Sequence, residues 1–73
     1  MSEKTIISYQ SEGKRIQLTR CVVYTMRNAL GYVVRWQIKN NRKVAFSSHN
    51  EDEIRIRFAN YLRDQILQKN LDL

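Results

Sequence analysis

The fold of this chain is decided by the stretch IQLTRCVVYTM (residues 16–26), in which apolar and more polar side chains alternate. One face of a strand here carries Ile16, Leu18, Arg20, Val22, Tyr24 and Met26, and the other carries Gln17, Thr19, Cys21, Val23 and Thr25. Successive side chains of a strand point to opposite faces, so the pattern predicts a half-buried antiparallel strand. Arg20 interrupts the apolar face, and we expect it at the core's edge with its stem packed and its head in solvent.

Three further segments alternate in the same way, at about residues 5–10, 32–39 and 43–47, and predict three more strands. The side chains expected to face the core are Ile7, Tyr9, Tyr32, Val34, Trp36, Ile38, Val44 and Phe46. Ile6 is expected on the opposite, outer face.

The turns between these segments set the register. A two-residue loop at Glu12-Gly13 would pair Tyr9 with Ile16 and Ile7 with Leu18. Residues 28–31 separate the second and third strands. Between the third and fourth strands, a two-residue loop at Asn40-Asn41 would bring the wrong face of the last strand to the core. The buried face fixes register, so a loop of three or five residues is predicted, pairing Trp36 with Phe46 and Ile38 with Val44.

The last third of the chain changes to helical periodicity. Ser48 with Glu51, or Asn50 with Glu53, forms a capping box at a helix start. An apolar stripe follows, made of Ile54, Phe58, Tyr61, Leu62 and Ile66. The helix is predicted from about residue 51 to about residue 69. The sequence therefore predicts a single α+β domain over residues 1–73, a four-stranded antiparallel β-meander with one C-terminal α-helix packed on one face of the sheet.

Charge is distributed unevenly along the chain, whose net charge is +6. Between Gly13 and Asn50 there is no acid, whereas the same segment contains Lys14, Arg15, Arg20, Arg27, Arg35, Lys39, Arg42 and Lys43. A one-signed surface of this kind attracts a polyanion or an acidic protein. The predicted function is that of a small non-enzymatic regulator that binds nucleic acid, most readily duplex DNA, through a basic sheet face and turns.

Seven residues are candidates for this contact, since their side chains bond phosphate oxygens and base edges. They are Lys14, Arg15, Arg35, Gln37, Lys39, Arg42 and Lys43. In the expected register, Thr19, Lys39 and Lys43 lie in one row of the outer face. An ordinary solvated sheet face with surplus cations explains the same pattern, and that alternative stays open.

The alternative function is a protein-binding regulator or inhibitor, for example a phage-type protein acting on host transcription machinery. The predicted helix carries a second apolar line on its far side, and the candidate interface consists of Ile56, Asn60, Arg63, Leu67 and Leu71. A helix packed on one sheet needs only one apolar face, so this line suggests a partner helix or a homodimer. The outer sheet face is the other possible protein contact, because it carries the apolar side chains of Ile6, Cys21, Val23, Val33 and Ala45.

Catalysis has little support in this sequence. His49 is the only histidine and Cys21 the only cysteine, so no cysteine-based metal site can close and no internal disulfide forms. No enzyme activity, metal or cofactor is expected. The lone cysteine favours a reducing, cytoplasmic location. There is no long apolar run, so no membrane partner is expected.

The segment from Gly31 to Leu62 resembles, in its order of elements, the arm-binding domains of tyrosine recombinases, which are small DNA readers built of a sheet and a helix. The features that carry this resemblance are GYVVRW at residues 31–36, a basic turn, VAFSS at residues 44–48 and an acidic helix start. The resemblance implies DNA binding through the sheet.

Overall fold

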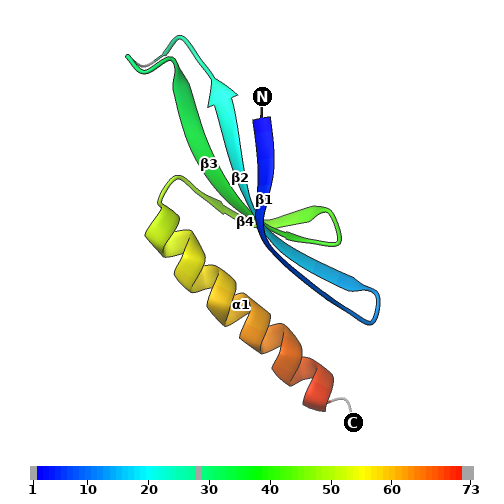
Figure 1. Ribbon diagram of the computed structural model, residues 1–73. Coiled ribbons are helices and arrows are strands. Elements are labelled where there is room, and N and C mark those ends of the chain that lie inside the picture. Colours follow the sequence, from blue (N-terminus) through cyan, green and yellow to red (C-terminus); the bar gives the residue numbers. More distant parts are fainter. Residues whose placement is uncertain (1, 28, 72–73) are drawn as a thin grey trace.

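The computed structural model describes residues 2–27 and 29–71, with side chains as far as Leu67. Four strands, β1 (Ser2–Ser11), β2 (Lys14–Tyr24), β3 (Tyr32–Asn40) and β4 (Lys43–Ser48), form one antiparallel sheet in sequence order. A C-terminal helix, α1 (Glu51–Leu71), packs on one face of this sheet (Figure 1). The α+β meander is confirmed and the first turn lies where it was predicted, although β1 begins earlier than predicted and the second and third turns are placed differently along the chain.

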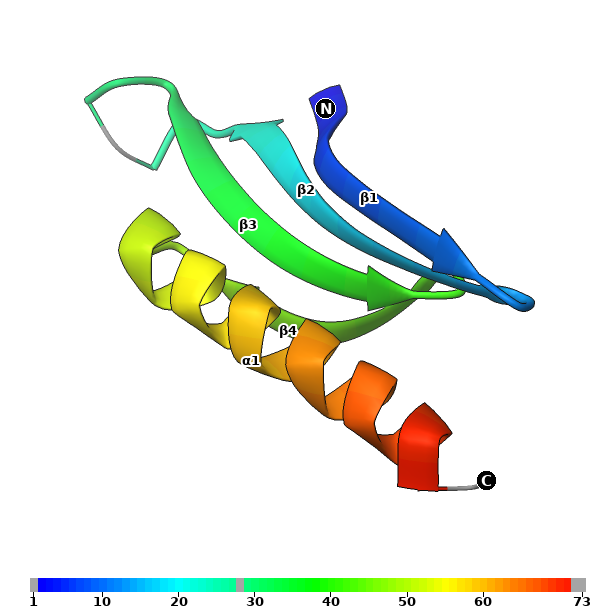
Figure 2. The same ribbon diagram turned by 60° about the horizontal axis from the view of Figure 1, so that its bottom comes forward.

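The core lies between α1 and the middle of the sheet. Its buried members come from β2, β3 and the helix, and they are Ile16, Leu18, Trp36, Ile38, Ile54 and Phe58. Tyr61 and Leu62 pack against this cluster, so the first part of the predicted helix stripe is confirmed. Figure 2 shows the helix running along the sheet beside β3 and β4. Arg20 is half-buried with its guanidinium carbon 5.9 Å from the centroid of Trp36, at the edge of the core as predicted.

The helix begins with a side-chain cap. The backbone N–H of Glu53 donates to Oδ1 of Asn50 at 3.0 Å, which makes Asn50 the N-cap and selects the second of the two predicted boxes. Ser48 takes the reciprocal role, because its hydroxyl accepts the N–H of Asn50 at 3.0 Å and donates to Glu53 at 3.4 Å. Glu51, Asp52 and Glu53 fill the first turn, where the helix dipole favours acids.

The β1–β2 hairpin has the predicted register, with Tyr9 opposite Ile16 and Ile7 opposite Leu18. Beyond this point a β-bulge between Thr5 and Ile7 shifts the pairing. The extra residue, Ile6, packs against the core cluster, whereas Ile7 is exposed. The prediction for Ile6 is therefore wrong, because a bulge leaves one residue unpaired and re-aims its side chain. Ile7 keeps its predicted place opposite Leu18 but is exposed instead of buried.

The β3–β4 hairpin also contains a bulge. Its turn is the two-residue loop Asn41-Arg42, with Asn40 opposite Lys43, and the register shifts between Ile38 and Lys39. Ile38 consequently faces Phe46, and Trp36 faces Ser48. The predicted longer loop and its Trp36–Phe46 and Ile38–Val44 pairs are wrong. The bulge restores the correct face in a different way, since one extra residue brings Phe46 back to the core side. Val44, predicted to face the core, lies opposite Lys39 and is exposed, because it precedes the bulge.

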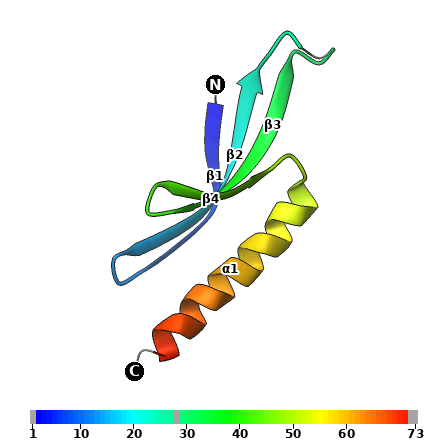
Figure 3. The same cartoon turned by 180° about the vertical axis from the view of Figure 1, so that it is seen from behind.

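The far ends of β2 and β3 extend beyond the helix as a two-stranded projection. We call residues 22–27 and 29–34 the distal hairpin. Figures 1 and 3 both show it projecting away from the start of α1. Tyr24 and Tyr32 are exposed there, contrary to their predicted core positions, because β4 ends opposite Trp36 and the helix starts directly after it. The molecule is consequently elongated, measuring 52 × 21 × 15 Å along its principal axes.

Candidate nucleic-acid interface

Two turns lie side by side at the end of the sheet opposite the distal hairpin. The backbone N–H of Arg15 donates to Oδ1 of Asn41 at 2.8 Å, and the N–H of Asn41 donates to the carbonyl of Arg15 at 2.9 Å. This reciprocal pair links the start of β2 to the turn between β3 and β4. The two turns are therefore held in a fixed relation by backbone geometry and one amide side chain.

Both turns require left-handed backbone conformations at their two central residues. The φ angles are 45° and 83° at Glu12 and Gly13, and 51° and 74° at Asn41 and Arg42. Positive φ at both central positions is the signature of the type I′ hairpin turn, which matches the twist of the strands. Gly13 and Asn41 tolerate this conformation well, whereas Arg42 adopts it at a steric cost.

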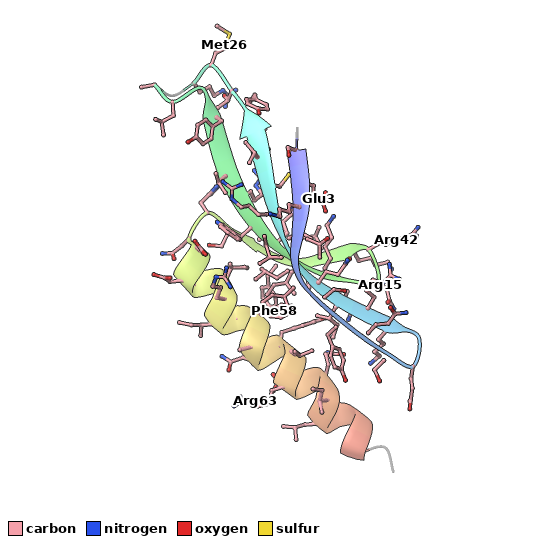
Figure 4. All side chains as sticks on the ribbon, in the orientation of Figure 1. Glu3, Arg15, Met26, Arg42, Phe58 and Arg63 are labelled. Atoms are coloured by element: carbon pink, nitrogen blue, oxygen red, sulfur yellow. The ribbon has the colours of Figure 1, made fainter. Side chains whose placement is uncertain are left out.

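The turns bring four exposed cations together, which we call the basic end: Lys14, Arg15, Arg42 and Lys43. With Glu12 as the one acid of these two turns, the formal charge here is 4 − 1 = +3. Within the described part of the chain, Arg15, Arg42 and Lys43 form no ion pair. Figure 4 shows Arg15 and Arg42 at this end of the molecule and Met26 at the other. The basic end therefore presents unneutralised guanidinium and ammonium groups.

A shallow hollow of about 240 Å³ lies between the two turns. It is lined by Gln10, Gly13, Lys14, Arg15, Asn41 and Arg42. Nζ of Lys14 donates to Oε1 of Gln65 at 3.3 Å, so this side chain is directed along the helix. Amide, ammonium and guanidinium donors around one open hollow form a setting in which a phosphate group can be bound.

The other three candidate side chains do not join the basic end. Lys39 forms an ion pair with Glu3 across the outer face of the sheet. Gln37 is half-buried between Thr19 and Ser47 in the ladder. Arg35 lies opposite Cys21 and lines a hollow with Arg27 towards the distal hairpin. The seven predicted residues thus separate into one cluster of four and three scattered positions.

The predicted row of Thr19, Lys39 and Lys43 is wrong. Thr19 lies opposite Gln37, and Lys39 lies opposite Gln17 and Val44. Lys43 is displaced by the turn and bulge between β3 and β4, which place it opposite Asn40. Thr19 is displaced because β2 ends at Tyr24 and the loop to β3 closes with the N–H of Thr25 donating to the carbonyl of Gly31 at 3.0 Å. Ending the strand two residues earlier shifts every pair along it.

The ion pair between Lys39 and Glu3 covers part of the outer face. Glu3 is opposite Cys21 and Lys39 is opposite Gln17, so the pair crosses Thr19, which lies between them on β2. Thr19 is 1% exposed, and its hydroxyl has no hydrogen-bond partner among the described residues. The outer face is therefore less open and less basic than the sequence suggested.

The second apolar line of the helix is solvent-exposed. Ile56, Asn60, Arg63 and Leu67 all lie on the side of α1 opposite Ile54 and Phe58. The side chain of Leu71, the fifth residue of this predicted interface, lies outside the described residues. Figure 4 shows Arg63 pointing away from the sheet, whereas Phe58 points towards it.

Sequence reasoning missed the apolar side chains of the distal hairpin as a surface feature. Tyr24 and Tyr32 were assigned to the core because their alternation fits a strand packed on one side. A usable signal was the length of the last strand: β4 has six residues, whereas β2 has eleven. A shorter edge strand leaves the ends of its neighbours beyond the reach of the helix that follows it.

The described part of the chain contains no group of three or more His, Cys, Asp or Glu side chains placed to hold a metal ion. In the same part, no helix has the length and apolar character needed to cross a membrane. Comparison with models of protein families, with curated proteins and with solved structures found no match.

Proposed function

We propose that this chain is a small non-enzymatic regulator that binds duplex nucleic acid, with DNA as the preferred form, through the basic end. The observation that carries the proposal is the reciprocal Arg15–Asn41 hydrogen-bond pair, which holds Arg15 and Arg42 on adjacent turns. Cations fixed on a rigid scaffold lose less side-chain and loop entropy on binding than cations on mobile loops. Phosphate contacts then supply the affinity.

The number of cations sets the expected salt dependence. If all four residues of the basic end contact phosphates, log K falls with log salt with a slope of about −3.6, which is −0.9 for each neutralised phosphate. Lys39 is left out of this count because Glu3 already neutralises it. The proposal therefore predicts a smaller slope than contact through the whole sheet face would give.

The test is a titration of random duplex DNA over a range of salt concentrations. Arg42→Gln with Lys43→Gln should halve the slope, to about −1.8, because two of the four phosphate contacts are lost. The matched control, Arg35→Gln with Arg63→Gln, removes the same charge from exposed positions outside the turns and should leave the slope unchanged. Absence of duplex binding at about 50 mM salt, where electrostatic affinity is strong, contradicts the proposal.

A second candidate function is supported by the exposed line on α1. Ile56 and Leu67 are 65% and 50% exposed, whereas Ile54 and Phe58 on the opposite side of the helix are buried. We propose, as the alternative, a regulator or inhibitor that binds a protein partner along Ile56, Asn60, Arg63 and Leu67. Ile56→Glu with Leu67→Glu would then abolish partner binding, whereas nucleic-acid binding through the basic end would not change.

A further inference from the structure

The distal hairpin carries a concentrated set of exposed apolar side chains. Tyr24, Met26, Leu30 and Tyr32 are 70%, 101%, 73% and 40% exposed. Tyr24 and Tyr32 face each other across the ladder, so both lie on the side of the sheet that faces the helix. Met26 and Leu30 follow in the connecting loop, where they line a hollow of about 560 Å³. This end of the molecule therefore exposes apolar side chains to solvent.

The accessible surface of the whole chain is larger than that of a compact monomer of the same mass. The accessible surface is 5610 Å² for a mass of 8.8 kDa. A compact monomer of this mass exposes about 4,800 Å², so this chain has about 800 Å² more. One partner in a stable interface of standard size buries about 800 Å². The excess surface therefore matches what one copy would contribute to a dimer.

One cation and one carboxylate flank the apolar side chains of the distal hairpin. Arg27 lies in the loop at its tip and is exposed. At its base the helix begins with Glu51, Asp52 and Glu53, close to Val34, whose carbonyl is 3.1 Å from Nδ1 of His49. Glu51 and Glu53 pair with Arg55 and Arg57, whereas Asp52 forms no ion pair within the described residues. The tip of the hairpin thus offers one cation, Arg27, and the base offers one carboxylate without an ion pair among the described residues, Asp52. The base as a whole is not negative, because Arg20 and Arg55 lie over Trp36 beside it.

We propose that two copies of this chain associate through their distal hairpins about a two-fold axis. The hairpins pack antiparallel, tip to base, and bury Tyr24, Met26, Leu30 and Tyr32 of both copies. Arg27 of each copy then lies near Asp52 of the other. A two-fold interface uses the same patch twice and must be self-complementary, which an apolar centre flanked by Arg27 at one end and Asp52 at the other satisfies. The proposal does not depend on nucleic-acid binding.

The first test is the mass of the purified full chain by sedimentation equilibrium. At about 100 µM, well above the dissociation constant expected for an interface of this size, the mass should be twice 8.8 kDa. Met26→Glu with Leu30→Glu should give a monomer. Both side chains are exposed, so the variant should retain the circular dichroism spectrum and thermal midpoint of the monomeric fold. A monomeric wild type at this concentration overturns the proposal.

The matched control places the same two charges elsewhere. Ile56→Glu with Leu67→Glu alters side chains of similar exposure on the far side of α1 and should leave the dimer intact. If this variant is monomeric while the Met26→Glu, Leu30→Glu variant remains dimeric, the interface is on the helix and the proposal is wrong.

A charge swap tests the tip-to-base arrangement. Arg27→Glu and Asp52→Arg should each raise the dissociation constant, by about tenfold for a close pair. The double variant restores the opposite charges in reversed order and should return the dissociation constant to near the wild-type value. If the double variant dissociates more than either single variant, the two residues do not face each other, and the antiparallel packing is wrong.

Discussion

Replacing Asn41 tests whether one amide holds the two turns together. Asn41→Ala removes the acceptor of the Arg15 N–H, which is worth about 0.5–1.5 kcal/mol net. Alanine must also adopt a φ near 51°, where a residue with an ordinary β-carbon is disfavoured by about 1–2 kcal/mol. The expected loss is about 2 kcal/mol. For a domain of this size each kcal/mol lowers the thermal midpoint by roughly 4–8 °C, so a fall of about 8–16 °C is expected.

Two further substitutions at the same position separate the contributions. Asn41→Gly keeps the positive φ but loses the hydrogen bond and adds about 0.5–1 kcal/mol of backbone entropy, so it should be less harmful than alanine. Asn41→Asp keeps both the φ tolerance and the acceptor, and its stability should stay near that of the wild type. The aspartate nevertheless introduces a negative charge beside Arg15 and Arg42. DNA binding should therefore weaken although the fold is retained, with the salt slope reduced by about 0.9.

The assay is thermal unfolding followed by circular dichroism, with a salt titration against duplex DNA for each variant. An alanine variant that melts at the wild-type midpoint would show that the turns are not held by Asn41. A glycine variant less stable than the alanine variant would contradict the argument from backbone conformation. If Asn41→Asp bound DNA as tightly as the wild type, the turns would not be the nucleic-acid surface.

Three other predictions concern stability. Phe58→Ala should lower the free energy of unfolding by about 3–5 kcal/mol, because removing a buried ring leaves a cavity. A urea titration should find this variant largely unfolded, and a midpoint near that of the wild type would contradict the core assignment. Thr19→Val should stabilise the fold by about 1 kcal/mol, since valine has nearly the same volume and removes a buried hydroxyl that has no hydrogen-bond partner in the described part of the chain. A lower thermal midpoint for this variant would point to a water molecule bound to the hydroxyl. Asn50→Ala should cost about 1 kcal/mol as the loss of a helix cap, whereas Asn50→Ser should cost little; equal losses would rule out the capping role.

The sequence predicted the parts of the fold that depend on local patterns. Alternation over residues 16–26 and 32–39 identified two strands, and the Asn50–Glu53 pair identified the helix start within a residue. It did not predict the two bulges. The sequence did show that a two-residue loop before the last strand would turn the apolar side chains of that strand away from the core. Either a longer loop or a bulge restores the correct face. The structure has a two-residue turn whose φ angles suit Asn41, and Ala45 takes up the extra position in β4.

The candidate site was predicted only in part for a related reason. The four residues of the basic end, Lys14, Arg15, Arg42 and Lys43, lie near turns. Alternate turns of a meander lie at the same end of the sheet, so these residues come together even if the exact pairing of the strands differs. Arg35, Gln37 and Lys39 lie within a strand, where a shift of two residues changes every neighbour. The contact between Lys39 and Glu3 joins the first strand to the third, and no local pattern in the sequence encodes such a long-range pair.

The two proposed surfaces are compatible because they lie at opposite ends of an elongated molecule. A dimer brings two chains of charge +6 together, which opposes association. Contact through the distal hairpins keeps the two basic ends outermost, and the molecule is 52 Å long. The Debye length at physiological salt is only about 8 Å, so repulsion between the basic ends is almost fully screened at that separation. Contact through the basic ends themselves would bring eight cations close together without a counterion. Apolar association at one end and binding of a polyanion at the other therefore do not compete.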